Sequence, residues 1–121
     1  RSRPRGTEIG EGFTSFDAIR DEIAPYLRNV KLLVERRWRE ALLTRYSGTA
    51  VTEAQVDCEI SPEGEVVRVE VVGTPDDRIF AAICKQAIER AGPFGPFTFE
   101  VPEMYRNQNM EIHWTFTFMK R

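Results

Sequence analysis

Residues 55–71, which read QVDCEISPEGEVVRVEV, decide the fold of this chain. Apolar and polar side chains alternate on both sides of residues 61–64, as in two strands that each bury one face. The segment 61–64, Ser-Pro-Glu-Gly, has proline and glycine where a tight turn favours them. The stretch therefore predicts a β-hairpin. Its inward-facing residues are expected to be Val56, Cys58, Ile60, Val67, Val69 and Val71.

Apolar residues recur at helical spacing before the hairpin. The stripe consists of Tyr26, Val30, Val34, Trp38 and Leu42, widened by Leu27 and Leu33. Proline suits the first turn of a helix but removes a hydrogen bond farther inside, so we expect this helix to run from near Pro25 to near Leu43. A shorter helix, capped by Thr14 or Ser15, is expected to end at Ala24.

The first residues of the chain show no apolar period. Residues 1–13 are polar and rich in Gly and Arg, which predicts the disordered end of a linker and leaves 14–121 as the domain. The sequence begins at Arg1 without Met, so we interpret it as a fragment of a longer protein.

A second helix and a last strand follow the hairpin. The helix is expected to be capped by Thr74 or Asp76 and to stop at Gly92-Pro93, with Ile79 and Phe80 beginning its apolar stripe. The loop after it has two apolar plugs, and the last strand alternates from residue 110 to residue 118. The plugs are Phe94 and Phe97, and the inward residues of the strand are Met110, Ile112, Trp114, Phe116 and Phe118.

The order helix, helix, strand, strand, helix, strand predicts an α+β fold. A hairpin followed by a helical crossover and one more strand favours a split β-α-β arrangement, a three-stranded antiparallel sheet packed by helices. The first strand of the hairpin would lie in the middle, and the other two strands would be the edges.

Length and charge exclude several classes of protein. A chain of 121 residues, 41% hydrophobic, forms one domain. Its longest charge-free runs, such as Ala91 to Phe99, reach only half of the roughly 18 residues of a membrane span. A net charge of −2 argues against general nucleic-acid binding. In the basic run 36–39, Trp38 belongs to the apolar stripe and the arginines to the solvated side.

No group of residues indicates catalysis. The single histidine, His113, excludes a two-His metal motif and is expected on the polar face of the last strand, exposed to solvent. The glycines at 6, 10 and 12 do not follow a strand and so do not form a phosphate-binding turn. We therefore expect no catalytic residue, cofactor or metal.

The two cysteines, Cys58 and Cys84, are 26 positions apart, which is neither a redox nor a zinc-ribbon spacing. One is expected on the core face of a strand and the other on the buried stripe of the helix that packs on the sheet. Two interpretations stay open, a disulfide in an oxidising compartment and a pair of buried free thiols.

The order and spacing of these elements resemble the periplasmic C-terminal domain of the TonB and TolA energy-transducing proteins. The resemblance covers about residues 25–119. It rests on Tyr26, Val30, Val34 and Trp38, on 60–67 (ISPEGEVV) with Val69, Val71 and Gly73, on 87–91 (AIERA) leading to Pro93-Phe94, on 101–103 (VPE) and on 111–116 (EIHWTF).

The resemblance implies a non-enzymatic periplasmic module whose parent chain is anchored in the inner membrane by an upstream segment and coupled to a proton-driven motor. Envelope or outer-membrane protein segments would be its partners. TolA-like members also carry a cysteine pair that bridges a strand to the following helix. Relative to that pair, Cys58 and Cys84 are displaced by about one strand or helical repeat.

An exposed strand edge fits such a module, because unpaired N–H and C=O groups bind an extended peptide without any catalytic group. We expect the outer edge of the last strand to bind the partner. Two alternatives are a small ligand-binding domain and a structural homodimer that pairs the same edge, so the protein is expected to be a monomer or an edge-paired dimer. The partner-binding residues would be Met110, Glu111, Ile112, His113, Trp114, Thr115, Phe116, Thr117 and Phe118.

Overall fold

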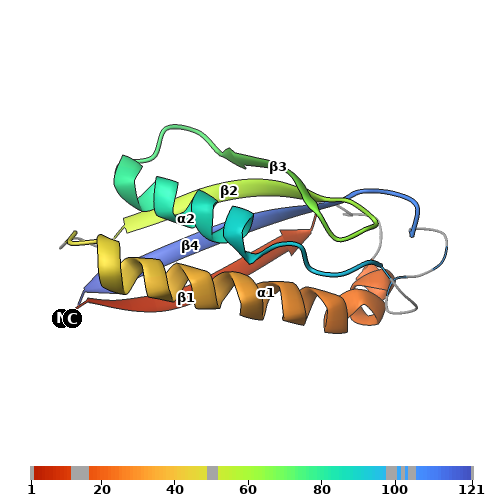
Figure 1. Ribbon diagram of the computed structural model, residues 1–121. Helices are drawn as coiled ribbons and strands as arrows, with labels where there is room; N and C mark the ends of the chain where they lie inside the picture. The colour runs from red at the N-terminus through yellow and green to blue at the C-terminus, as the bar shows by residue number, and fades with distance from the viewer. Residues whose placement is uncertain are drawn as a thin grey trace.

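The computed structural model describes residues 2–11, 17–48, 52–97, 101, 103 and 106–120. Within them, four antiparallel strands form one sheet in the order β1-β4-β2-β3, and two helices lie against the same face of it (Figure 1). The fold is α+β, as the sequence predicts. The elements are β1 (Ser2–Glu11), α1 (Asp17–Arg45), β2 (Thr52–Ile60), β3 (Val66–Val71), α2 (Arg78–Ala91) and β4 (Met110–Lys120).

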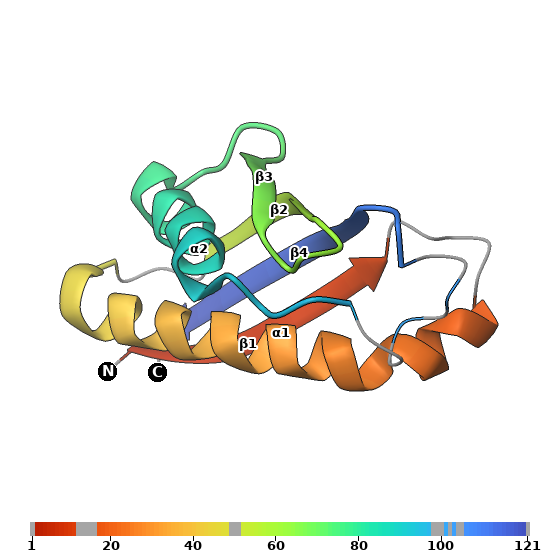
Figure 2. The ribbon, with the colours of Figure 1, turned by 45° about the vertical axis from the view of Figure 1, so that its right-hand side comes forward.

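The core lies between the helices and the sheet (Figure 2). Aromatic rings fill its centre, where Trp38 of α1 is 5.3 Å from Phe116 of β4 and 6.3 Å from Phe80 of α2, measured between ring centroids. All three side chains are fully buried. The inward residues predicted for β4 and the α1 stripe at every fourth position are buried as well.

The hairpin forms as expected, with one shift. β2 is the central partner of β3 and β4, but a bulge at Glu59 and Ile60 places Val66 opposite Ile60. Val66 therefore packs on the core, and Val67, predicted to point inward, is 52% exposed. An extra residue in one strand changes the side-chain alternation, which sequence periodicity alone does not detect.

The first helix corrects two expectations. α1 is continuous from Asp17 to Arg45 with Pro25 inside it, whereas the sequence predicts a break at that residue. Pro25 is exposed, so its ring lies on the solvent side of the helix. In Figures 1 and 2 the ribbon of α1 changes direction in its first turns, as expected where proline removes a hydrogen bond. Thr14 and Ser15, the predicted caps, lie outside the described residues.

The first ten described residues overturn the prediction of a disordered linker end over 1–13. Ser2–Glu11 forms β1 and pairs with β4 from Ser2 opposite Lys120 to Glu11 opposite Ile112. A boundary at residue 14 would therefore cut through the sheet. Main-chain hydrogen bonds hold an edge strand whatever its side chains are, so a Gly-rich and Arg-rich sequence without alternation can still pair.

α2 begins one residue later than expected. Asp77, not Thr74 or Asp76, is the N-cap, and its carboxylate accepts from the backbone N–H of Phe80 at 2.9 Å and from the hydroxyl of Tyr46 at 2.6 Å. Burial opposes ionisation of Asp77, but these hydrogen bonds outweigh it, so the pKa of Asp77 lies below its ordinary value. Burial, together with the bond to Asp77, raises the pKa of Tyr46 to about 12. Ile79, expected on the buried face, is 66% exposed.

The loop after α2 fastens the helix layer to the hairpin turn. Phe94 and Phe97 are both buried, as the plugs were expected to be. The backbone N–H of Phe94 donates to the carbonyl of Gly64 at 2.8 Å, and the hydroxyl of Tyr26 donates to the carbonyl of Gly95 at 2.9 Å. Among the described residues, neither helix has the length and apolar character needed to cross a membrane.

Candidate partner-binding strand

β4 is the longest of the three strands that form the predicted sheet, and its two faces differ as the sequence predicts. Met110, Ile112, Trp114, Phe116 and Phe118 point into the core and are at most 2% exposed. Glu111, His113, Thr115 and Thr117 lie on the opposite face and are exposed or half-buried. The nine residues predicted to bind a partner thus form one continuous strand.

A three-stranded sheet would leave the outer edge of β4 free, but in the structure this edge is paired. β4 pairs with β2 on one side and with β1 on the other. The edge predicted to bind an extended peptide therefore already binds one, supplied by the same chain. No sequence pattern indicates this pairing, because β1 has neither alternation nor β-branched enrichment.

The hydrogen-bond register identifies which amides of β4 face β1. In an antiparallel ladder the N–H and C=O of one residue point to the same neighbouring strand, and those of the next residue point to the other. The N–H of Val72 donates to the carbonyl of Gln55 at 2.8 Å, so Gln55 faces β3 and Val56 faces β4. Trp114 lies opposite Val56, which means that the next amide, that of Thr115, faces β1.

A polar network covers the outer face of the sheet. Arg68 of β3 contacts three carboxylates, Glu59 at 3.3 Å and Glu70 and Glu111 at 3.1 Å each. Asn109 also donates to Glu59, and these bonds lower the pKa of Glu59, with that from Asn109 contributing most. The network joins three strands by side chains that remain open to solvent.

His113 lies in the same face, opposite Asp57 of β2, and its Nδ1 contacts the Asp57 carboxylate. The side chain of His113 is 41% exposed, as expected for a histidine on the polar face of a strand. Within the described residues, no three His, Cys, Asp or Glu side chains are grouped so as to hold a metal ion.

The disulfide considered for Cys58 and Cys84 is absent from the structure, in which both are free, fully buried thiols. Cys58 lies on the core face of β2, where the indole N–H of Trp114 donates to its sulfur at 3.2 Å. Burial raises the pKa of Cys58 to about 11 and also raises that of Cys84. Both groups are therefore protonated at neutral pH.

We expect these thiols to react slowly in the folded protein. At pH 8 a thiol with a pKa near 11 is ionised to only about one part in a thousand, and only the thiolate is nucleophilic. Alkylation of Cys58 and Cys84 by iodoacetamide, followed by mass spectrometry, should be at least about a hundredfold slower in buffer than in denaturing urea. An unreduced sample two hydrogens lighter than the dithiol would contradict this result and favour the bridge.

The basic run 36–39 is arranged as the sequence predicts. Trp38 is buried, whereas Arg36, Arg37 and Arg39 are exposed, and Arg39 pairs with Glu35 at 3.2 Å. The arginines of this run and the polar face of β4 do not form one surface, because the helices and the outer face lie on opposite sides of the sheet (Figure 2).

No family model matches this chain, and no curated protein or solved structure matches it either.

Proposed function

We propose that this domain is a non-enzymatic protein–protein interaction module similar to the TonB/TolA-like C-terminal domain, which binds segments of envelope proteins by β-strand addition to β4. In this proposal it is periplasmic, and its parent chain is anchored in the inner membrane and couples a proton-driven motor to the outer envelope. It takes neither nucleic acid nor a cofactor.

The observation that carries the proposal is the pairing of β4 with β1. The outer edge of β4 binds an extended segment over residues 112–120, and that segment, Ser2–Glu11, lacks an apolar pattern. Affinity that comes from main-chain bonds tolerates many sequences, which is the property that strand addition needs. Thr115 and Thr117, beside this edge, would add modest selectivity.

The order β4-β2-β3 also supports the proposal. It places the hairpin strand β2 in the middle and gives β4 one side for a further strand, which β1 occupies in this structure. An incoming envelope segment would replace β1, so β1 and the partner compete for the same amides. Loosening β1 should therefore strengthen partner binding.

One pair of variants tests whether β1 is held through main-chain bonds. Glu8 lies opposite Thr115, so its N–H faces β4, whereas the N–H of the neighbouring Thr7 faces away. Glu8→Pro removes a donor to β4, and Thr7→Pro is the matched control with its donor on the open side. In hydrogen exchange, the amides of His113, Thr115 and Thr117 should exchange at least about tenfold faster in Glu8→Pro and near the wild-type rate in Thr7→Pro. Equal rates in both variants would contradict the assigned pairing.

A photo-crosslinking amino acid at Thr115 tests the function in cells. Thr115 lies on the outer face beside the β1 edge, and a crosslinker at Leu32, 56% exposed on α1, serves as the control. We expect crosslinks to an envelope or outer-membrane protein from position 115 only, with a higher yield when Glu8→Pro is added. Crosslinks from 115 solely to a second copy, together with a mass that rises with concentration, would favour the structural homodimer instead.

A further inference from the structure

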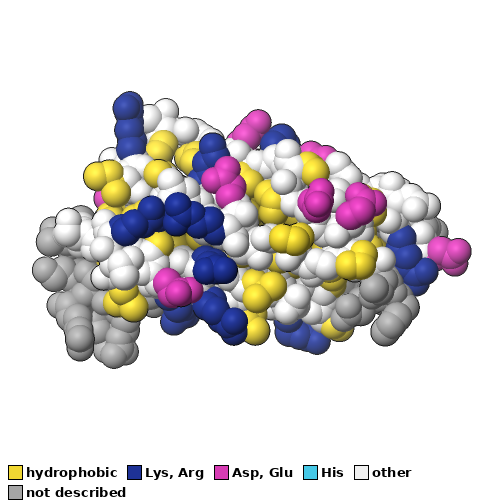
Figure 3. All heavy atoms as spheres, in the orientation of Figure 1, with side chains coloured by type: hydrophobic (Ala, Val, Ile, Leu, Met, Phe, Trp, Pro, Cys, Tyr) yellow, Lys and Arg dark blue, Asp and Glu magenta, His cyan; other side chains and the backbone are white. Residues whose placement is uncertain are grey.

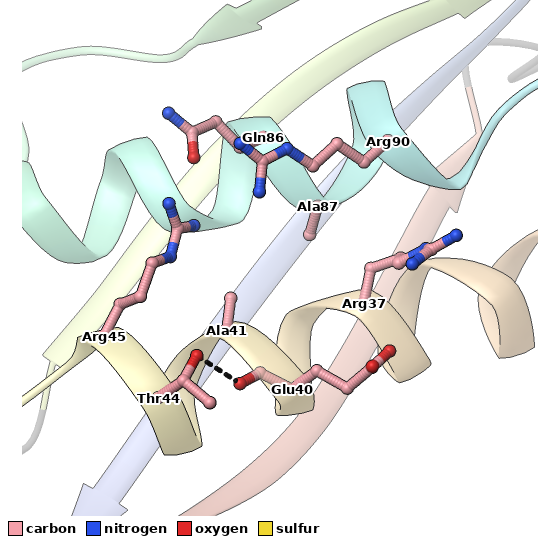
Figure 4. A pocket seen from close by; sticks show the side chains of 8 residues that line it. All are labelled: Arg37, Glu40, Ala41, Thr44, Arg45, Gln86, Ala87 and Arg90. Atoms are coloured by element: carbon pink, nitrogen blue, oxygen red, sulfur yellow. Dashed lines mark hydrogen bonds between the residues drawn. The ribbon is translucent and has the colours of Figure 1, made fainter.

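A groove between the two helices lies on the far side of the molecule from the outer face of the sheet. It has a volume of about 270 Å³ and is lined by side chains from the second half of α1 and from α2 (Figure 4). Ala41 and Ala87 face each other across it, and their small side chains leave the space open. Water occupies about 30 Å³ per molecule, so the groove has room for a small polyatomic ion.

Two arginines from different helices reach over this groove. Arg45 extends from α1 and Arg90 from α2, and both guanidinium groups lie near Gln86 (Figure 4). Glu40, the acidic side chain of the lining, points away from both of them. Among the described residues, no carboxylate lies within ion-pair distance of Arg45 or Arg90, whereas Arg39 has Glu35. Two like charges that share a groove repel each other unless an anion lies between them.

Gln86 provides a second, independent observation. Its Oε1 atom is buried and has no hydrogen-bond partner among the described residues. Turning the amide by half a turn places its NH₂ group at the same point and adds two donors to those of the guanidinium groups. A group with several acceptor oxygens would satisfy all of these donors.

The charge of the helix layer favours an anion at this place. Residues 25–45 and 78–91 contain nine Lys and Arg against three Glu. Dark blue side chains accordingly gather over the helices in Figure 3. Along β2, β3 and β4 the outer face of the sheet has the opposite balance, with Glu53, Asp57, Glu59, Glu70 and Glu111 against Arg68. The described side chains are therefore polarised across the sheet, and an anion is attracted to the helix side.

We propose that this groove binds a phosphate group through Arg45, Arg90 and Gln86. A guanidinium group presents its donors in a planar fork that pairs with two oxygens of phosphate, and two such forks from opposite helices hold a tetrahedral ion from two sides. The phosphate would come either from a free ion or from a lipid headgroup. The site lies away from β4, so its failure and that of the proposed function are separate results.

A double variant tests the site. Arg45→Gln with Arg90→Gln removes both forks, and Arg36→Gln with Arg39→Gln is the control because it lowers the charge of the helix layer equally outside the groove. In titrations with inorganic phosphate at fixed ionic strength, the wild-type amides of 45, 86, 87 and 90 should shift and saturate. The apparent affinity should fall at least about tenfold in the groove variant and less than twofold in the control.

Thermal melting provides a second measurement that does not depend on the amide shifts. Phosphate should raise the Tm of the wild type and of the control variant but not that of Arg45→Gln with Arg90→Gln. If the two arginines only stabilise the last turns of their helices, the groove variant will lose Tm without phosphate and phosphate will have no effect on any of the proteins. That outcome, or equal weakening in both variants, would overturn the proposal.

Vesicles distinguish the two sources of phosphate. The protein should float with phosphatidylglycerol vesicles and not with phosphatidylcholine vesicles if a headgroup is bound, and the groove variant should lose this flotation. Saturable binding of inorganic phosphate without flotation would assign the site to a free ion. The absence of both phosphate binding and flotation would contradict the proposal.

Discussion

Replacing Trp38 with alanine should lower the free energy of unfolding by about 3–5 kcal/mol, the usual cost of removing a large aromatic side chain from a core. Trp38 is fully buried and contacts a ring of the sheet, Phe116, and a ring of the neighbouring helix α2, Phe80. Small domains are stable by only about 5–15 kcal/mol, so this loss should be a large fraction of the total stability. Urea unfolding followed by circular dichroism measures the loss.

Two variants control for this measurement. Trp38→Phe keeps a buried aromatic ring at the same place, so it should lower the free energy of unfolding by less than half as much as the alanine variant. Leu43 lies five positions farther along the same helix and is 79% exposed, and Leu43→Ala should change stability by at most about 0.5 kcal/mol. A loss below about 1 kcal/mol for Trp38→Ala would show that α1 does not pack through this residue.

The parts of the fold that the sequence predicts are those determined by side-chain periodicity. Spacing by four along α1 and alternation along β2 and β4 report directly which face is buried, and Trp38, Cys58 and Trp114 lie as expected. Local chemistry also located the hairpin turn and the end of α2. These features depend on neighbours in the sequence, so one sequence is enough to predict them.

The parts that the sequence does not predict depend on distant segments. β1 is held by the main chain of β4, more than a hundred residues away, and its own side chains carry no strand pattern. Pro25 is expected to separate two helices, but a single helix runs through it with the proline exposed to solvent. In β1, pairing with a distant strand overrides local preference.

The candidate sites divide in the same way. Alternation in the sequence predicts that the nine residues of β4 form a strand, but it does not predict that β1 covers the edge of that strand. The groove of Arg45 and Arg90 joins residues 45 positions apart on two helices, and nothing in either local sequence distinguishes these arginines from the other basic residues. Only the packing of α1 against α2 brings them together.

Glycine at position 64 should be the least replaceable residue of the hairpin turn. Gly64 has a φ of +87°, which side chains other than hydrogen rarely allow, and its backbone carbonyl accepts from the N–H of Phe94. A Cβ atom built at this position would lie 2.0 Å from the carbonyl oxygen of Gly95, which is backbone and has no rotamer with which to move away. The turn and the loop after α2 would have to separate.

Gly64→Ala should therefore lower the free energy of unfolding by at least about 2 kcal/mol, and Gly73→Ala by only about 1 kcal/mol. Gly73 is the matched control because its φ of +69° is also positive, but a Cβ atom there would have no neighbour within 4 Å. The difference between the two variants isolates the contact with Gly95 from the backbone strain that they share. Urea unfolding measures both losses, and amide shifts should extend to Phe94 and Phe97 in Gly64→Ala alone. Equal losses in the two variants would show that the turn is not held against this loop.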